Sequence, residues 1–351
     1  MKPRFVPSLV LALTLMGAVS ACGLRKPLPE GAELIPADAT FAISLDVPSL
    51  LNSRLYELYK SRESAFGLNR LNFYKFAEAT GIDPSKDVQR VMFLATAGDD
   101  GLREMSGVAM GTFDGRKVYD FLKDSGLPSQ KVAGMDIFEV VVLDGRCRFC
   151  IGVVDASTAI FGDGETLEKV AQVKSGSKPG LSAEERAGRL LRRMGRDPEG
   201  WGIVRAEDLR GAIGGVLGGL NQANALAALG PIREVSFSFD DGEPIRALVE
   251  MTAATDEDAM RVADILKGAE SLGRLALKET SPDLGRLMSD LVIEADTGIV
   301  RAAGSIPSSD VDNVARLLGG KMGGLMGFGG AGQPTSGQPD PPAGPDGAST
   351  P

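Results

Sequence analysis

The chain contains no histidine among its 351 residues. Histidine is the commonest general base and metal ligand near neutral pH, so its absence excludes Ser-His and Cys-His nucleophile pairs and every histidine-ligated metal site. Basic residues are also in deficit, with 38 lysines and arginines against 47 aspartates and glutamates. Because binding to a nucleic-acid duplex depends on neutralising phosphates, this deficit argues against a nucleic-acid partner. We therefore expect no nucleic acid, no metal and no other cofactor.

Long hydrophobic runs are lacking as well. The apolar stretch from Val10 to Val19 is too short, and too near the amino terminus, for a stable membrane span. Lys2 and Arg4 precede this stretch and small residues follow it. Residues 1–21 are therefore typical of an export signal.

The four residues Val19-Ser20-Ala21-Cys22 resemble the lipobox of bacterial lipoproteins, where a diacylglyceryl group is attached to the cysteine before cleavage. The resemblance implies a mature chain that begins at Cys22 and is held on a membrane, since two acyl chains give stable anchoring. Gly23 stands where an aspartate commonly signals inner-membrane retention, which implies the outer membrane and its periplasmic face. The outer face of the plasma membrane is the alternative address, and an ordinary secretory signal with an incidental cysteine is the alternative signal. Residues 22–34 follow as a tether.

The body of the chain carries an internal duplication, which predicts its architecture. A strand, a hairpin, a capped helix and further strands follow in the same order in residues 35–174 and 201–318, and the capped helix begins at Asp114 in one copy and Thr255 in the other. This order predicts an α+β class with two related halves, each a mostly antiparallel sheet with helices packed on one face. The expected strands span residues 41–47, 88–96, 106–112, 137–143, 146–154 and 159–161, then 201–205, 235–240, 245–252, 291–296 and 299–305. The expected helices span residues 49–62, 71–80, 114–125 and 165–173, then 209–229, 256–267 and 309–318.

Two segments lie outside the duplicated halves. Residues 175–200 form a linker, in which a capping box at Ser182 and Glu185 predicts a connecting amphipathic helix. Residues 319–351 change abruptly to a composition rich in glycine and proline. Such a segment has too few branched apolar side chains to offset the entropy of ordering, so we expect a disordered tail.

The start of the body also carries a resemblance. Ile35-Pro36-Ala37-Asp38-Ala39-Thr40-Phe41, leading to Asp46-Val47-Pro48-Ser49-Leu50, resembles the start of uncharacterised bacterial envelope proteins with the same order of strand and helix. The resemblance implies an envelope location and no particular activity.

An arginine stripe is the first candidate binding surface. Arg186, Arg189, Arg193 and Arg196 recur at helical spacing on one face of the expected connecting helix. Guanidinium groups bind phosphates and carboxylates, so the stripe fits lipid headgroups or an acidic partner. In an acidic protein the same stripe also fits internal salt bridges, and this intramolecular role is the favoured interpretation.

The second candidate is an uncharged segment, Gly211–Leu229. Gly211, Gly215 and Gly219 recur every four residues, as small residues do where helices pack closely. Asparagine and glutamine in its middle argue against a membrane span, so a helix packed against the sheet is favoured. The alternative makes these glycines the floor of an apolar groove for an acyl chain or another hydrophobic ligand.

Cys147 and Cys150 have the Cys-x-x-Cys spacing of redox pairs. Redox pairs of this kind usually open a helix, whereas these cysteines fall in an expected strand, where residues three apart point to opposite faces. Aligning the two copies places apolar Ile299 and Ala302 opposite them. We therefore expect two small apolar side chains of the core, with a redox pair or an isolated strained disulfide as alternatives.

Pairs of acidic residues have structural explanations. Residues 99–100 and 240–241 fall at hairpin tips, and residues 256–258 begin a helix. Neither the ligand spacing of a calcium loop nor a phosphate-binding glycine run occurs in the sequence. No catalytic residue is identified, and we expect the protein not to be an enzyme.

Together these observations favour a lipid-anchored cell-envelope protein with a non-catalytic binding or structural role and an envelope protein as its partner. The alternative is a carrier or sensor of a lipid or other hydrophobic ligand, and a hydrolase is a weaker one. A carrier needs an apolar cavity of roughly 300 Å³ or more. An enzyme needs converging polar side chains with perturbed pKa values, and a binding protein needs an exposed apolar patch.

Overall fold

The computed structural model describes residues 27–53, 80–97, 103–143, 145–194, 198–206, 230–240, 242–280 and 290–307, together with Glu78, Gly285 and Asp310. Expectations for the signal segment, Cys22, most of the helices at 49–62 and 71–80, the helices at 209–229 and 309–318, and the tail lie outside the described residues.

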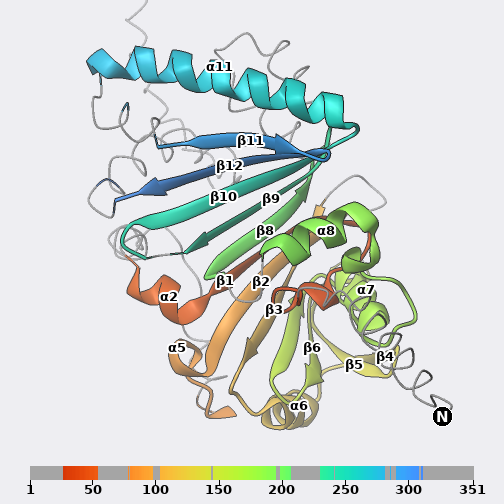
Figure 1. Ribbon diagram of the computed structural model, residues 1–351. Coiled ribbons are helices and arrows are strands. Elements are labelled where there is room, and N and C mark those ends of the chain that lie inside the picture. The colour runs from red at the N-terminus through yellow and green to blue at the C-terminus, as the bar shows by residue number, and fades with distance from the viewer. Residues whose placement is uncertain are drawn as a thin grey trace, which may run out of the picture.

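Within the described residues, one antiparallel sheet of twelve strands dominates the structure (Figure 1). The strands of its first part are β1 (Ala39–Asp46), β2 (Val88–Ala97), β3 (Arg103–Gly111), β4 (Ser129–Val132), β5 (Met135–Leu143), β6 (Arg146–Asp155) and β7 (Thr158–Gly162). Those of its second part are β8 (Gly200–Arg205), β9 (Ile232–Asp240), β10 (Ile245–Ala253), β11 (Val292–Asp296) and β12 (Ile299–Ile306). Their order across the sheet is β11-β12-β10-β9-β8-β1-β2-β3-β7-β6-β5-β4.

The two parts of the chain meet at the centre of this sheet. β1 pairs with β2 on one side and with β8 on the other, so that Phe41 lies opposite both Ala95 and Val204. The junction is held further by Arg205, whose Nε donates a hydrogen bond of 3.0 Å to the carbonyl oxygen of Ala39. The strands from both parts therefore share one continuous hydrogen-bonded ladder.

Helices connect many of the strands along the chain and pack on the sheet. They are η1 (Ala32–Leu34), α2 (Val47–Asn52), α5 (Pro84–Asp87), α6 (Gly115–Asp124), α7 (Gly164–Lys174), η3 (Leu181–Ala183), α8 (Glu185–Met194) and α11 (Asp256–Thr280). The caps expected at Asp114 and Thr255 are confirmed, since Asp114 accepts the N–H of Arg116 at 3.0 Å and Thr255 accepts the N–H of Asp258 at 3.1 Å. The capping box expected at Ser182 and Glu185 is wrong, because Ser182 lies within η3 and α8 begins at Glu185. No helix among the described residues has both the length and the apolar character needed to cross a membrane.

The helices pack on both faces of the sheet, which corrects the expectation of one covered face. On one face, Met92 and Leu94 of β2 belong to the main core, with residues of η1, α7 and α8. On the other face, α6 packs near β5–β7 and α11 packs near β10–β12. The physical reason lies in the strands themselves. β6 carries Cys150 in the main core on one face and Ile151 and Val153 packed with α6 on the other, so both of its faces are covered.

Three glycines in the sheet are each covered by a phenyl ring from the neighbouring strand. The pairs are Gly107 with Phe161, Gly200 with Phe239, and Gly202 with Phe237, and the members of each pair lie directly opposite one another. A Cβ atom at any of these glycines would collide with the ring. The strand expected at residues 235–240 is therefore present in β9, and its phenyl rings cover backbone that has no side chain of its own at the facing glycines.

Candidate functional site

Three of the four arginines of the expected stripe lie on α8, which packs on the main core through Ala187, Leu190 and Leu191. Arg196 lies outside the described residues, as do Cys22 and the glycines Gly211, Gly215 and Gly219. Arg186 is exposed, and Arg189 pairs with Glu185 of the same helix at 3.2 Å.

Arg193 is committed to an internal contact. Its Nη2 lies 2.8 Å from Oε1 of Glu250 and its Nε lies 3.1 Å from Oε2. This is the geometry of a bidentate ion pair between a guanidinium and a carboxylate. Glu250 lies on β10 and is only 3% exposed. Hydrogen bonding to Glu250 raises the pKa of Arg193 against the opposing effect of burial. This arginine fastens α8 to the second part of the sheet, while Arg186 and Arg189 face solvent.

A solvent-facing apolar stripe runs along α11. Ile265, Leu272 and Leu275 are 43%, 71% and 68% exposed, and Gly268 between them has no neighbouring atom within 4 Å of the place a Cβ would occupy. Residues at i, i+3, i+7 and i+10 share one face of a helix. The opposite face of α11 buries Ala259, Val262 and Ala263 in the core, so the packing of α11 on the sheet does not require this stripe. We call Ile265, Gly268, Leu272 and Leu275 the α11 stripe.

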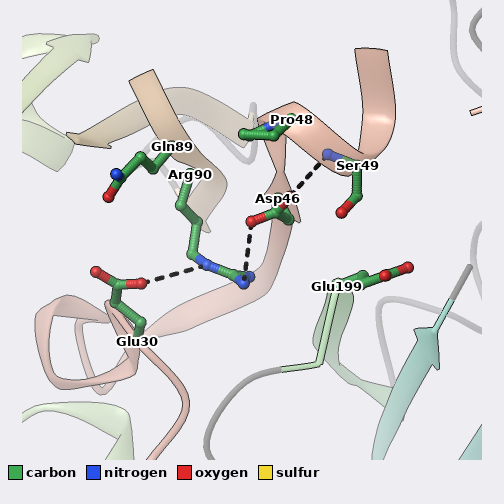
Figure 2. Close-up of a pocket in the computed structure, with 7 residues that line it drawn as sticks. All are labelled: Glu30, Asp46, Pro48, Ser49, Gln89, Arg90 and Glu199. Atoms are coloured by element: carbon green, nitrogen blue, oxygen red, sulfur yellow. Dashed lines mark hydrogen bonds and ion pairs between the residues drawn. The ribbon is translucent and has the colours of Figure 1, made fainter. Parts of the chain in front are cut away.

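One cavity of about 370 Å³ lies beside the start of α2. Arg90 lies between Glu30 and Asp46 there (Figure 2), with Nε 3.5 Å from Oε2 of Glu30. Its guanidinium also donates to Ser44 Oγ at 3.3 Å and to the carbonyl oxygen of Pro198 at 3.1 Å. Arg90 is 5% exposed, so its contacts serve to hold the segment before β8 against β1 and β2.

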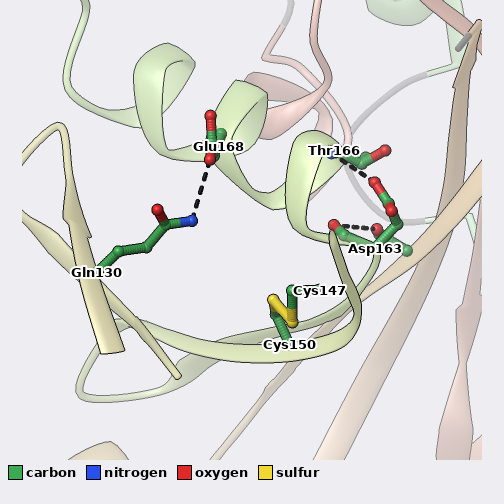
Figure 3. Close-up of a disulfide and its surroundings, with 7 residues drawn as sticks. Gln130, Cys147, Cys150, Asp163, Thr166 and Glu168 are labelled. Carbon is green, nitrogen blue, oxygen red and sulfur yellow. Dashed lines mark hydrogen bonds between the residues drawn. A yellow bond between two sulfur atoms is a disulfide. The ribbon is translucent and has the colours of Figure 1, made fainter. Parts of the chain in front are cut away.

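A second cavity of about 370 Å³ lies over β6, and a disulfide between Cys147 and Cys150 borders it (Figure 3). The expectation of two unlinked apolar cysteines is wrong. Cys147 lies opposite Val142 and Phe149 lies opposite Val141, so Arg148 is an extra residue in β6. Such a bulge shifts the alternation by one, and both cysteines reach the same face.

The repeat alignment used for these cysteines also fails. β12 borders β10 directly, whereas β6 is separated from β3 by β7. Ile299 and Ala302 of β12 are therefore not the positional counterparts of Cys147 and Cys150. The bulge itself leaves no mark in the residue pattern that would reveal it.

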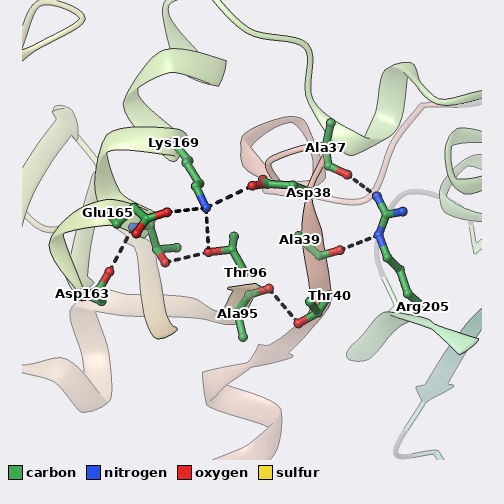
Figure 4. A network of polar contacts seen from close by, with 11 residues as sticks. Ala37, Asp38, Ala39, Thr40, Ala95, Thr96, Asp163, Glu165, Lys169 and Arg205 are labelled. Carbon is green, nitrogen blue, oxygen red and sulfur yellow. Dashed lines mark hydrogen bonds and ion pairs between the residues drawn. The ribbon is translucent and has the colours of Figure 1, made fainter. Parts of the chain in front are cut away.

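A partly buried lysine of α7, Lys169, joins the first turn of this helix to the start of β1 (Figure 4). Nζ of Lys169 lies 3.0 Å from Asp38, 2.9 Å from Glu165 and 3.3 Å from Oγ1 of Thr96. Burial lowers the pKa of Lys169, but hydrogen bonds to the two carboxylates outweigh burial and raise it above its usual value. The ammonium group stays protonated, so it donates to Thr96 and does not take a proton from it.

The other shifted pKa values also favour the protonation state that each group has at neutral pH. The hydrogen bond with Lys86 lowers the pKa of Asp83 to about 2, and the hydrogen bond with Asp136 raises the pKa of Tyr119. Each shift stabilises the protonation state that the group has at neutral pH. The described residues also contain no group of three or more side chains placed to hold a metal ion.

Both cavities are lined mainly by polar and charged residues. The α11 stripe is an apolar surface that meets solvent, and Val140, Val141, Val142 and Phe149 on β5 and β6 are exposed as well. The disulfide is the group with covalent chemistry.

A scan of the sequence against protein-family models finds no match, and a search of curated proteins finds none. A search of solved structures finds the structure of crystal form I of TP0453, which has 9% sequence identity to this chain. The match covers 84% of this chain and 99% of that chain, with a TM-score of 0.38.

Proposed function

We propose that the chain is a lipid-anchored cell-envelope protein that binds a macromolecular partner through the α11 stripe, and that this stripe has a binding role and not a catalytic one. The lipobox resemblance at Val19–Cys22 supplies the anchor, on the periplasmic face of the outer membrane. The α11 stripe is the observation that carries the binding role. Monomeric proteins rarely leave neighbouring leucines about 70% exposed on one helix face without a use for them.

The occupant that fits this stripe is an amphipathic helix of another envelope protein. Gly268 leaves a notch between Ile265 and Leu272, where a side chain of a facing helix can insert. Asp264 and Arg261 both lie exposed beside the stripe, so its flanks carry charges of both signs. A partner helix with both acidic and basic residues along its flanks complements this surface.

The position of the stripe favours a protein partner over the bilayer. Leu28, near the start of the described chain, packs against the main core that contains η1, α7 and α8. The six residue steps from Cys22 to Leu28 span roughly 20 Å at most, which keeps this face near an anchoring bilayer. α11 packs against residues of the opposite face, such as Val249. The α11 stripe then points away from the membrane, toward partners in the adjoining space.

We also propose that the two parts of the sheet are related halves of one duplicated unit. From the centre outward, β1-β2-β3-β7 and β8-β9-β10-β12 each begin with three consecutive strands and continue with the last strand of that part. Each third strand is followed along the chain by a capped helix, α6 or α11, on the same face. An ancestral unit that paired through its first strand accounts for both features.

Site-specific photo-crosslinking in intact cells tests the binding role. A photoreactive residue at position 272 is expected to give one protein adduct, and Leu275→Ser in the same chain is expected to remove it. Burying an exposed leucine contributes about 1.5–3 kcal/mol, so the loss of this side chain weakens binding by about tenfold to a hundredfold. The matched control places the photoreactive residue at Lys267, which is exposed on α11 but lies off the stripe.

Because Leu275 is 68% exposed, Leu275→Ser should leave the melting temperature of the chain unchanged. Equal adducts at 267 and 272, or none at either, would overturn the proposal. An adduct of twice the mass of the chain would show a second copy instead of a different protein. Adducts with lipid alone would favour the carrier alternative.

A further inference from the structure

The disulfide in β6 lies directly against the amino end of α7. A Cβ atom placed on Gly164, the first residue of α7, would lie 3.3 Å from Cβ of Cys147 and 3.3 Å from Sγ of Cys150. The glycine therefore lets the helix start approach both cysteines, as Figure 3 shows for α7 above β6. The amino end of a helix carries partial positive charge and stabilises a thiolate beside it.

Along the chain, the two cysteines do not lie at the start of a helix. In the folded protein, the start of α7 lies beside them instead. β6 and α7 are connected through β7, and the bulge at Arg148 turns both cysteines toward α7. The arrangement thus combines the three features of exchange-active cysteine pairs, namely the spacing, the helix end and an open approach.

The approach is open to one sulfur only. Cys150 is 0% exposed and belongs to the main core, whereas Cys147 is partly exposed and lines the cavity of about 370 Å³. A nucleophile that enters this cavity meets Cys147 first. Attack there releases the buried Cys150 as the leaving group, which is the order of events in asymmetric dithiol sites.

Charge at the cavity defines the class of partner. Glu139, Asp163, Glu165 and Glu168 line it, and Arg146 is the basic residue in the same lining. Asp163 accepts the N–H of Thr166 and caps α7, and Oε1 of Glu168 accepts a hydrogen bond of 3.1 Å from Gln130. The rim therefore carries excess negative charge, which favours approach by a polypeptide with basic residues around its cysteines.

We propose that Cys147 and Cys150 form a thiol–disulfide exchange site that oxidises a cysteine pair in a basic segment of a partner protein. A partner thiolate attacks Sγ of Cys147, the bond to Sγ of Cys150 breaks, and Cys150 leaves as a thiolate that is then protonated. The second partner thiol attacks the partner sulfur of this mixed disulfide and releases Cys147. The partner gains a disulfide and loses two electrons and two protons, and the two cysteines of this chain gain them.

The test uses the oxidised full-length mature protein with two synthetic dithiol peptides, one flanked by lysines and one by glutamates. Alkylation followed by peptide mass spectrometry measures reduction at Cys147 and Cys150, and far-UV circular dichroism shows whether the fold persists. We expect reduction in the folded state, a mixed disulfide on Cys147 alone, and a rate about tenfold higher for the lysine peptide at low salt. Reduction only after unfolding in urea, or a mixed disulfide on Cys150, would overturn the exchange site.

Single substitutions test the roles of the individual side chains in this exchange. Cys150→Ser should trap the oxidised lysine peptide on Cys147, whereas Cys147→Ser should leave buried Cys150 unreactive. Glu168→Gln should reduce the preference for the lysine peptide, and Glu185→Gln, a carboxylate 89% exposed on α8 and outside the cavity lining, should not. Equal rates for the two peptides with the unchanged protein would overturn the assignment of a basic partner.

Discussion

Arg90 is a buried cation and Lys169 a partly buried one in an acidic protein, and each is surrounded by oxygen atoms from separate parts of the chain. Arg90 reaches Ser44 on β1 and the carbonyl oxygen of Pro198 before β8. Lys169 reaches from α7 to Asp38 before β1. Because an unpaired buried charge costs several kcal/mol, such contacts fix the segments that supply the oxygens. Individual side chains thus hold the entry into β1 and β8, where the two parts of the sheet meet.

Asp155 provides a test of how the pairing of one charged side chain with nearby polar groups stabilises the fold. Burial raises its pKa, but hydrogen bonds from the N–H of Ser157, from Thr158 and from Lys174 together lower the pKa below its usual value of 3.8. A carboxyl group with a lowered pKa stabilises the fold above its unfolded-state pKa, and this contribution disappears as the pH falls through the lower folded-state value.

We therefore expect Asp155→Asn to lower the free energy of unfolding at pH 7 by less than about 1 kcal/mol, since the pair with Lys174 is partly exposed and screened. The difference from the unchanged protein should shrink once the pH falls below about 4. Urea unfolding at a series of pH values measures both quantities. A difference that stays constant down to pH 2 would contradict the assignment.

At the scale of elements, the glycine–phenylalanine pairs decide how close neighbouring strands pack. The three nearest atoms to a Cβ at Gly107 all belong to the ring of Phe161. We expect Gly107→Ala to destabilise the fold by about 1–3 kcal/mol, because the ring must move from its place over β3.

In a chain that also carries Phe161→Ala, the same glycine substitution should cost nearly nothing, since the obstacle is gone. Thermal or urea unfolding of the two single variants and the double variant measures the coupling between the positions. Additive losses would show that the backbone of β3, and not the ring, resists a side chain at 107.

Element boundaries show which parts of the fold a sequence reveals. Strands with alternating apolar residues, such as β2 and β9, lie where the pattern predicts them, because one or both faces are buried. β4 was not predicted, since its four residues are mostly exposed and have no apolar alternation. The predicted end of α11 at Lys267 is also wrong. Gly268 costs about 1 kcal/mol inside a helix, and the helix-forming residues that follow it carry α11 on to Thr280.

The candidate sites show the complementary limit. The α11 stripe lies largely beyond the predicted end of its helix, so the sequence pattern gave no reason to look for it. The disulfide depends on one unpaired residue, Arg148, and on a helix that approaches from a different part of the chain. Both features arise from tertiary placement, and neither periodicity nor residue spacing contains that information.

At the scale of the whole molecule, the proposed anchor rests on one side chain. Cys22→Ala removes the sulfur to which the lipid would be attached. We expect the variant to move from the membrane fraction to the soluble fraction of the cell, because the acyl chains on this sulfur are the proposed membrane attachment.

Fractionation of cells followed by immunoblotting measures this change, and Ser20→Ala, which keeps a small residue in the lipobox, is the matched control. Continued membrane association of Cys22→Ala would contradict the lipobox prediction. Mass spectrometry of the native amino terminus would identify the modification directly.

The pairing of β1 with β8 has a consequence for biosynthesis. The hydrogen bond from Arg205 to Ala39 joins residues 166 positions apart. A ribosome delivers the chain from its amino terminus, so β1 can pair with β2 early, while its other edge stays unsatisfied until β8 has been translated. A partly synthesised chain thus has an unpaired strand edge that other chains can join, and chaperones that cover such edges should influence the yield of the protein.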